Sequence, residues 1–200
     1  MNPRPRRRCD ALLLAPGAGA DRNHPTTVAI EQRVSPLPVG RMDFPYRKAG
    51  RKAPDRAPVL LDAVRAEAVS LVESTGVRAS RLGLGGRSMG GRMCSMAVAD
   101  GLPASALVLL SYPLHPPGRP DQLRVEHLPR LTQPCLFVSG TKDPFGTPAE
   151  LEKHAGAIAG PVTFVWVDGA GHDWKRRDDA VAEVVADWIA GRPVPEQLNR

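Results

Sequence analysis

The sequence has few aromatic residues, few cysteines and no long apolar run, and each shortage excludes a class of protein. Aromatic residues make up 4% of the chain, too few for a surface that stacks nucleic-acid bases. The three cysteines are an odd number without CxxC spacing, so we expect neither a disulfide framework nor a metal site. No apolar run approaches the ~18 residues of a membrane span, so we expect no membrane partner. These shortages favour a cytoplasmic protein.

Positive charge is the next feature of the composition. The formal net charge is +6, and the basic run RPRRR lies near the start of the chain. The remaining arginines are dispersed, which is typical of a solvated surface, so we expect no nucleic-acid partner. The apolar run Ala11–Ala15, which follows these basic residues, is shorter than the core of a signal peptide. We expect a flexible basic leader over residues 1–9, one domain over 10–191, and over 192–200 a flexible tail that has nothing to bury.

Strand-like and helix-like segments alternate along the chain. Apolar runs predict buried strands over residues 11–15, 105–111, 134–140 and 162–168, with weaker strands over 37–45 and around Leu82 and Leu84. Helical patterns cover residues 58–73, 89–99 and 181–189, a weaker one covers 24–34, and Thr147, Pro148 and Glu150 predict the start of another. This alternation indicates a single α/β domain, with a mostly parallel sheet and helices on both of its faces.

One serine lies in a glycine-rich turn between a weak strand and a helix. Residues 86–90, GRSMG, match the pattern G-x-S-x-G, in which a strained strand–turn–helix exposes a nucleophilic serine, here Ser88. The preceding strand is weakened by Gly83 and Gly85. The alternative is a glycine-rich loop in which Ser88 has no role.

A nucleophilic serine needs a base, and the base needs an orienting carboxylate. Asp143 follows the predicted strand over 134–140, and His172 follows the one over 162–168, so both are expected at the carboxyl edge of the sheet. Asp143 precedes a proline and has the alternative role of a turn former, and Asp168 is the rival acid. His24 and His154 are interpreted as polar surface residues.

Acyl transfer also needs donors for the developing oxyanion. The backbone N–H of Met89, directly after the serine, is one candidate, and the loop APGAGAD after the first strand supplies the other, Ala18. That loop contains neither G-x-G-x-x-G nor a P-loop lysine, so a phosphate cradle is not indicated.

Several motifs occur in the order found in one known family: PGAGAD, DFPY, GGRSMGGR, SYPLHPPG, KDPFG and GAGHDW. With these the chain resembles the α/β-hydrolase superfamily, in its small, lidless, dienelactone-hydrolase-like branch, near testis-expressed and NSL-complex-subunit relatives. The resemblance implies a single-domain α/β-hydrolase fold with trimmed N-terminal strands and no lid domain. It also implies Ser88 as nucleophile, Asp143 as acid and His172 as base, with His115 bordering the site. One departure is Pro16, which stands where the family usually has histidine in the oxyanion loop.

The expected function is that of a serine hydrolase that cleaves a small ester or thioester through an acyl-enzyme, without a cofactor. The alternative is a hydrolase-fold protein that binds a partner and catalyses nothing. Arg87 lies inside the G-x-S-x-G turn of residues 86–90, which is called the nucleophile elbow. It has two equal interpretations: attraction of an acidic substrate, or pairing with a surface carboxylate. The pattern predicts no particular oligomeric state.

Overall fold

The computed structural model describes residues 7–174 and 176–199, and its centre is a seven-stranded sheet. The order of the strands is β2-β1-β3-β4-β5-β6-β7, and every neighbouring pair is parallel. The strands are β1 (Ala11–Ala15), β2 (Val39–Arg41), β3 (Leu82–Arg87), β4 (Ala106–Leu110), β5 (Cys135–Gly140), β6 (Val162–Val167) and β7 (Gln197–Leu198).

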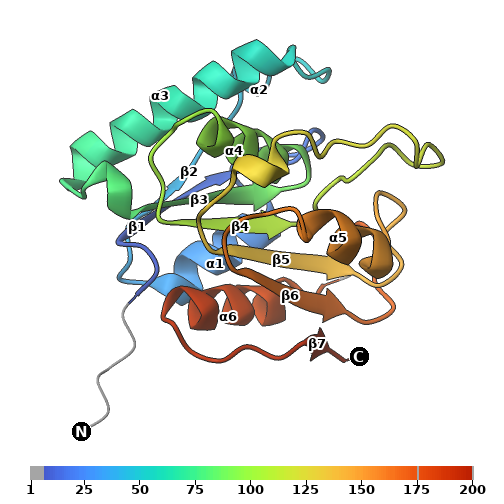
Figure 1. The fold of residues 1–200 in the computed structure, drawn as a ribbon. Helices are drawn as coiled ribbons and strands as arrows, with labels where there is room; N and C mark the ends of the chain where they lie inside the picture. Colours follow the sequence, from blue (N-terminus) through green and yellow to red (C-terminus); the bar gives the residue numbers. More distant parts are fainter. Residues whose placement is uncertain (1–6, 175, 200) are drawn as a thin grey trace, which may run out of the picture.

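Helices cover both faces of this sheet (Figure 1). They are α1 (Pro25–Val34), α2 (Pro45–Lys48), α3 (Ala57–Thr75), α4 (Met89–Ala99), α5 (Pro148–Ala155) and α6 (Asp178–Ile189), with 3₁₀ turns η1 (Ala79–Arg81) and η2 (Leu128–Arg130). Helices α1 and α6 lie against one face, and α3 and α4 lie against the other. The predicted single-domain α/β fold is therefore confirmed, and every strand and helix expected within the domain is present.

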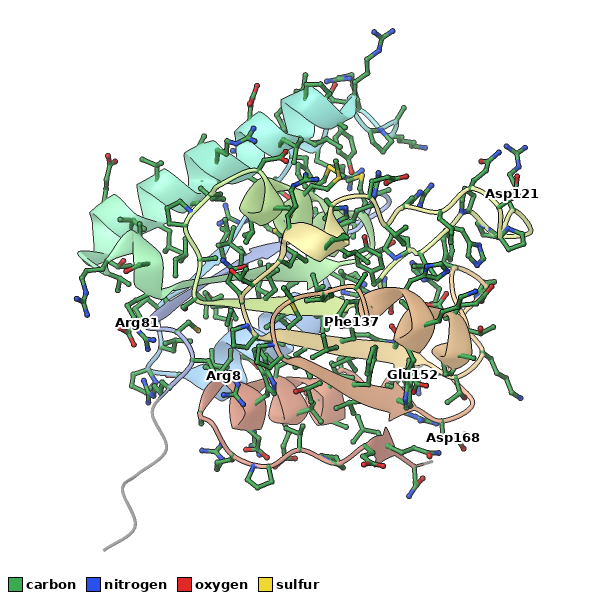
Figure 2. The ribbon with its side chains drawn as sticks, viewed as in Figure 1. Arg8, Arg81, Asp121, Phe137, Glu152 and Asp168 are labelled. Atoms are coloured by element: carbon green, nitrogen blue, oxygen red, sulfur yellow. The ribbon has the colours of Figure 1, made fainter. Side chains whose placement is uncertain are left out.

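The sheet has a separate apolar cluster on each face, because successive side chains of a strand point in opposite directions. Strand β1 is buried on both faces: Leu13 packs in the apolar cluster beneath α3 and α4, whereas Leu12 and Leu14 pack with α1 and α6. Burial on both faces explains why the strands are continuous apolar runs. In Figure 2, Phe137 of β5 lies inside the molecule, and it belongs to the first of these clusters.

The tail, expected to be flexible, instead adds an edge strand. Strand β7 pairs with β6, because the edge of β6 offers unpaired backbone groups: the N–H of Trp166 donates to Glu196 (2.9 Å) and that of Asp168 donates to Leu198 (3.0 Å). Val194 and Leu198 pack against the cluster of α1 and α6, so the expectation that the tail has nothing to bury is wrong.

The leader is also partly ordered. Residues 1–6 lie outside the described residues, but Cys9 is fully buried and the N–H of Arg8 donates to the carbonyl of Ile189 (2.8 Å). The Arg8 guanidinium lies 4.8 Å from the centre of the Trp188 ring, beside α6 (Figure 2). The end of the leader, residues 7–9, thus packs against the domain.

A long irregular segment connects β4 to η2. It projects from the carboxyl edge of the sheet, with Asp121 at its tip (Figure 2). Its base is fixed because the Tyr112 hydroxyl donates to the carbonyl of Arg124 (2.8 Å). Within the described residues, no helix combines the length and apolar character needed to cross a bilayer.

Candidate active site

Ser88 occupies a sharp turn between β3 and α4. Its backbone has φ 51° and ψ −120°, outside the regions that residues with a side chain normally adopt. The turn is held by the Ser88 N–H, which donates to the carbonyl of Leu110 (2.7 Å), and by the Ser88 carbonyl, which accepts from the N–H of Arg92 (3.1 Å). This is the strained strand–turn–helix that the sequence pattern predicts.

The glycines around Ser88 are required by close backbone approaches. A Cβ atom on Gly86 would lie 2.1 Å from the carbonyl oxygen of Ala15, and one on Gly90 would lie 2.3 Å from the same atom. In β3, a Cβ on Gly85 would lie 2.2 Å from the carbonyl oxygen of Val108 in the neighbouring strand. The glycines thus allow close packing that no larger residue permits, which argues against a merely flexible loop.

Three side chains predicted from separate loops are brought together here. The Nε2 atom of His172 lies 2.9 Å from the Ser88 Oγ. On the other side of the ring, Nδ1 lies 2.9 Å and 3.0 Å from the two carboxylate oxygens of Asp143. Asp143 is only 2% exposed, and its Oδ1 also accepts from the N–H of Phe145 (2.9 Å). The arrangement can pass a proton from the serine to an imidazole whose second nitrogen is fixed by a buried carboxylate.

The imidazole of His172 is held from several directions. The Phe145 ring lies against it, with the two ring centres 4.1 Å apart. The carbonyl of His172 accepts from the Arg87 guanidinium (2.5 Å) and from the Ser111 hydroxyl (3.2 Å). Arg87 therefore anchors the histidine loop, a role that neither interpretation of its sequence position included.

The rival acid, Asp168, belongs to a different part of the molecule. Its backbone N–H pairs with β7, and its carbonyl accepts from the Arg177 guanidinium (2.9 Å). Figure 2 shows Asp168 at the end of β6, on the side of the sheet where β7 lies. The carboxylate that contacts His172 is that of Asp143.

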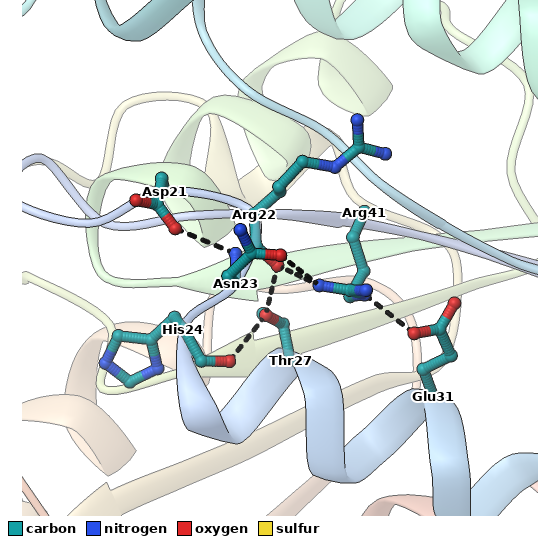
Figure 3. Close-up of polar contacts among 7 residues, drawn as sticks. All are labelled: Asp21, Arg22, Asn23, His24, Thr27, Glu31 and Arg41. Atoms are coloured by element: carbon teal, nitrogen blue, oxygen red, sulfur yellow. Dashed lines mark hydrogen bonds and ion pairs between the residues drawn. The ribbon is translucent and has the colours of Figure 1, made fainter.

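The loop after β1 lies directly against the elbow. A Cβ on Gly17 would be 3.6 Å from the Ser88 Cβ, and the carbonyl of Ala18 accepts from the Tyr46 hydroxyl (2.7 Å). Figure 3 shows how the following residues are fixed: the Arg41 guanidinium donates to Asn23 (3.2 Å) and to Glu31 of α1 (2.7 Å). The loop is thus tied to β2 and α1.

Two cavities meet at Ser88. One has a volume of about 370 Å³, and the other, of about 330 Å³, is lined by His172, His24 and Arg87. Ser88, Ala18 and Phe145 line both, whereas Met89 lines the first. A substrate with a group on each side of its reacting carbonyl would fit this arrangement.

The structure differs from the sequence-based interpretation at two histidines: His24, interpreted as a surface residue, and His115, expected to border the site. His24 is not simply a surface residue, because it caps α1 and its Nε2 lies 3.4 Å from the Arg87 guanidinium in the wall of the second cavity. Its position directly before Pro25, at the start of the helix that follows the loop after β1, was the available signal. His115 is absent from the walls of both cavities, and its N–H donates to the carbonyl of Phe145 (3.1 Å). His115 therefore supports the loop that contains Phe145 through this backbone hydrogen bond.

Comparison with known families agrees with this fold. The model of the family described as "Alpha/beta hydrolase domain" matches residues 8–189. The chain belongs to this α/β-hydrolase family. The predicted superfamily and its hydrolase class are thereby confirmed.

Solved structures of low sequence identity share the fold of this α/β hydrolase. A dienelactone hydrolase from Anabaena variabilis is 19% identical, with a TM-score of 0.72 over 93% of this chain and 88% of that one. The esterase domain of a Rhodothermus marinus protein is 18% identical, with a TM-score of 0.69 over 96% and 89%. The type II thioesterase BorB, from the borrelidin biosynthetic cluster, is 19% identical, with a TM-score of 0.63 over 92% and 96%.

A buried polar cluster lies behind the first cavity of the hydrolase. His127 is 5% exposed, and its Nε2 lies 2.8 Å from the Ser95 Oγ and 3.5 Å from the Tyr112 hydroxyl. Burial, and then the positive charges of Arg92 and Arg130, lower the pKa of His127 to about 4. The folded hydrolase therefore keeps this imidazole neutral at pH values where an unfolded chain protonates it.

This cluster predicts a loss of stability in mild acid. Between pH ~6.5 and about 4 the unfolded state binds a proton at His127 and the folded state does not, so the free energy of unfolding falls as pH falls through that window. The contribution amounts to about 3 kcal/mol at its lower end. Denaturant unfolding at pH 7.5 and pH 4.5 should show a smaller loss for His127→Gln than for the native protein. Equal losses in the two proteins would contradict the assignment.

Proposed function

We propose that this hydrolase cleaves a small ester or thioester through an acyl-enzyme, with Ser88 as nucleophile, His172 as general base and Asp143 as the orienting acid. The observation that carries the proposal is the 2.9 Å contact between Ser88 Oγ and His172 Nε2, with the opposite nitrogen of the same ring on a buried carboxylate. In such a group the serine hydroxyl attacks the carbonyl carbon while the imidazole takes its proton.

The tautomer of His172 follows from its contacts. The carboxylate of Asp143 only accepts hydrogen bonds when ionised, so it requires the ring proton on Nδ1 and leaves Nε2 free to accept from Ser88. Once Nε2 is protonated, the same carboxylate stabilises the imidazolium. The burial of Asp143 strengthens this interaction, because water does not screen it.

The oxyanion formed by the attack is assigned to two backbone amides, those of Met89 and Ala18. Both residues line the cavity that contains Ser88, and the Met89 amide belongs to the first turn of α4, where N–H groups have no partner within the helix. His172 then gives its proton to the leaving oxygen or sulfur, and the bond between that atom and the acyl carbon breaks. Water attacks the acyl-enzyme in the same way and releases the acid and free Ser88.

The class of substrate is supported by the neighbours and by the cavities. The similar structures include an esterase domain and a thioesterase, which act on oxygen and sulfur esters. The two cavities, each of a few hundred Å³, suit a small molecule. We assign Arg87 to the positioning of the histidine loop, since its guanidinium donates to the carbonyl of His172.

Covalent labelling tests the proposal. The folded protein should react with a fluorophosphonate probe, and the adduct should map to the peptide that contains Ser88, because this hydroxyl lines both cavities and contacts an imidazole that a buried carboxylate orients. Mass spectrometry of the digested adduct identifies the serine. Protein unfolded in denaturant is the control and should not react. A folded protein that never labels would support the alternative of a hydrolase-fold binding protein.

A further inference from the structure

Two arginines line the cavity of about 370 Å³ together with Ser88. Arg92 lies four residues after Ser88 on α4, so both residues face the same side of the helix, one turn apart. Arg124 comes from the irregular segment after β4, where its N–H donates to the carbonyl of Leu114 (2.9 Å). Both arginines are half-buried, so their guanidinium groups lie at the cavity and not in bulk water.

Neither guanidinium has an acidic partner. Among the residues that the structure describes, no carboxylate lies within 4.0 Å of Arg92 or Arg124, and the Nε of Arg92 is buried without a hydrogen-bond partner. Asp55 also lines the cavity: one of its carboxylate oxygens pairs with Arg51 (2.7 Å), and the other is buried without a hydrogen-bond partner, so the cavity wall holds one carboxylate and the two arginines. Half-buried charges without a partner are costly, and a ligand of opposite charge would offset that cost.

The two positive charges also act on each other and on their surroundings. Burial, and then repulsion by the Arg92 cation, lower the pKa of the Arg124 guanidinium. The same Arg92 charge, after burial, lowers the pKa of His127 behind the cavity. The two guanidiniums therefore bring positive charge to this cavity, and the planar fork of a guanidinium suits the two oxygens of a carboxylate.

The position of His172 decides which part of a substrate enters this cavity. In the proposed reaction His172 protonates the leaving group, so the leaving group must lie on its side. His172 lines the cavity of about 330 Å³ and is absent from the walls of the larger one. The larger cavity is thus on the acyl side, and its walls near Ser88 include the apolar side chains of Leu60, Met89 and Met93.

We propose that Arg92 and Arg124 form a subsite for an anionic group on the acyl part of the substrate, in its simplest form a terminal carboxylate. This inference rests on the proposed function, because it takes Ser88 as the acylated residue. The backbones of Ser88 and Arg92 are about one helical turn, or about 5.4 Å, apart along α4, so we assign the anionic group to a position a short chain away from the reacting carbonyl. Half-esters or half-thioesters of short dicarboxylic acids have this spacing.

The test compares two esters that differ mainly in charge: the mono-4-nitrophenyl ester of adipic acid and 4-nitrophenyl hexanoate. We expect kcat/KM of the native protein to be roughly tenfold to a hundredfold higher for the anionic ester, from two charge-assisted contacts. This ratio should fall in Arg92→Gln and in Arg124→Gln, each of which removes one of the two contacts, and should reach near one in the double variant. Arg124→Glu, in an irregular segment that tolerates change better than α4, should reverse the preference. Arg119→Gln removes the same charge from an exposed site on that segment and should keep the native ratio.

Each alternative result of these kinetic measurements contradicts one part of the proposal. Efficient hydrolysis of the hexanoate ester without preference for the adipate ester overturns the anionic subsite and leaves the proposed function standing. Preference for 4-carboxyphenyl hexanoate over phenyl hexanoate, without preference for the adipate ester, overturns the acyl-side assignment. Failure to hydrolyse any of these esters, together with failure to label Ser88, overturns the proposed function itself.

Discussion

Replacement of Ser88 by alanine is expected to reduce kcat for hydrolysis of 4-nitrophenyl hexanoate by about a millionfold. The alanine cannot form the acyl-enzyme, and His172 Nε2, 2.9 Å from the serine oxygen in the native protein, loses the group from which it takes a proton. The fold should survive, because the backbone bonds that hold the turn, to Leu110 and Arg92, do not involve the hydroxyl. Steady-state kinetics against the buffer rate measures the effect, and thermal unfolding checks the fold.

Ser105→Ala is a matched control for this variant. Ser105 lies just before the amino end of β4, and its hydroxyl donates only to the carbonyl of Leu82 (3.3 Å). Its removal should change kcat by less than about twofold, as expected for a substitution outside the site. If Ser88→Ala kept a large part of the native rate, hydrolysis would proceed without an acyl-enzyme at this residue, and the assignment of the nucleophile would be wrong.

The elbow and the positions of the acid and base follow from local sequence patterns. Apolar runs fix where β5 and β6 end, and in a parallel sheet all strands end at the same edge, so Asp143 and His172 are expected near Ser88 from the chain order alone. Gly85 was interpreted as a weakness of β3, since propensity treats each residue alone. In the fold it allows close contact with β4.

The features of the site that the sequence pattern does not predict depend on contacts between loops. The contact between the rings of Phe145 and His172, the anchoring of the histidine loop by Arg87 and the place of His24 in a cavity wall all join residues that are far apart in the chain. The misjudged tail has a similar cause. Pairing of β7 requires only backbone groups and an open edge on β6, and neither is visible in the periodicity of the side chains.

Asp143→Asn should lower kcat by about four orders of magnitude while leaving the fold intact. In the native protein both carboxylate oxygens lie within 3.0 Å of His172 Nδ1, which requires the proton on that nitrogen. The Oδ1 atom also accepts from the N–H of Phe145, so an asparagine keeps its carbonyl oxygen there and turns its amide N–H₂ towards the ring. The imidazole then carries its proton on Nε2 and cannot accept one from Ser88.

Asp168→Asn is the matched control, because it makes the same chemical change at the carboxylate that rivals Asp143 in the sequence. The structural anchors of Asp168 that involve its backbone, to Leu198 and Arg177, persist in an asparagine, so kcat should stay within about threefold of the native value. Labelling by the fluorophosphonate probe should become much slower in Asp143→Asn and still map to Ser88, because the nucleophile is present but its base is in the wrong tautomer. If Asp168→Asn lost the activity and Asp143→Asn kept it, the acid assignment would be wrong and the nucleophile would still stand.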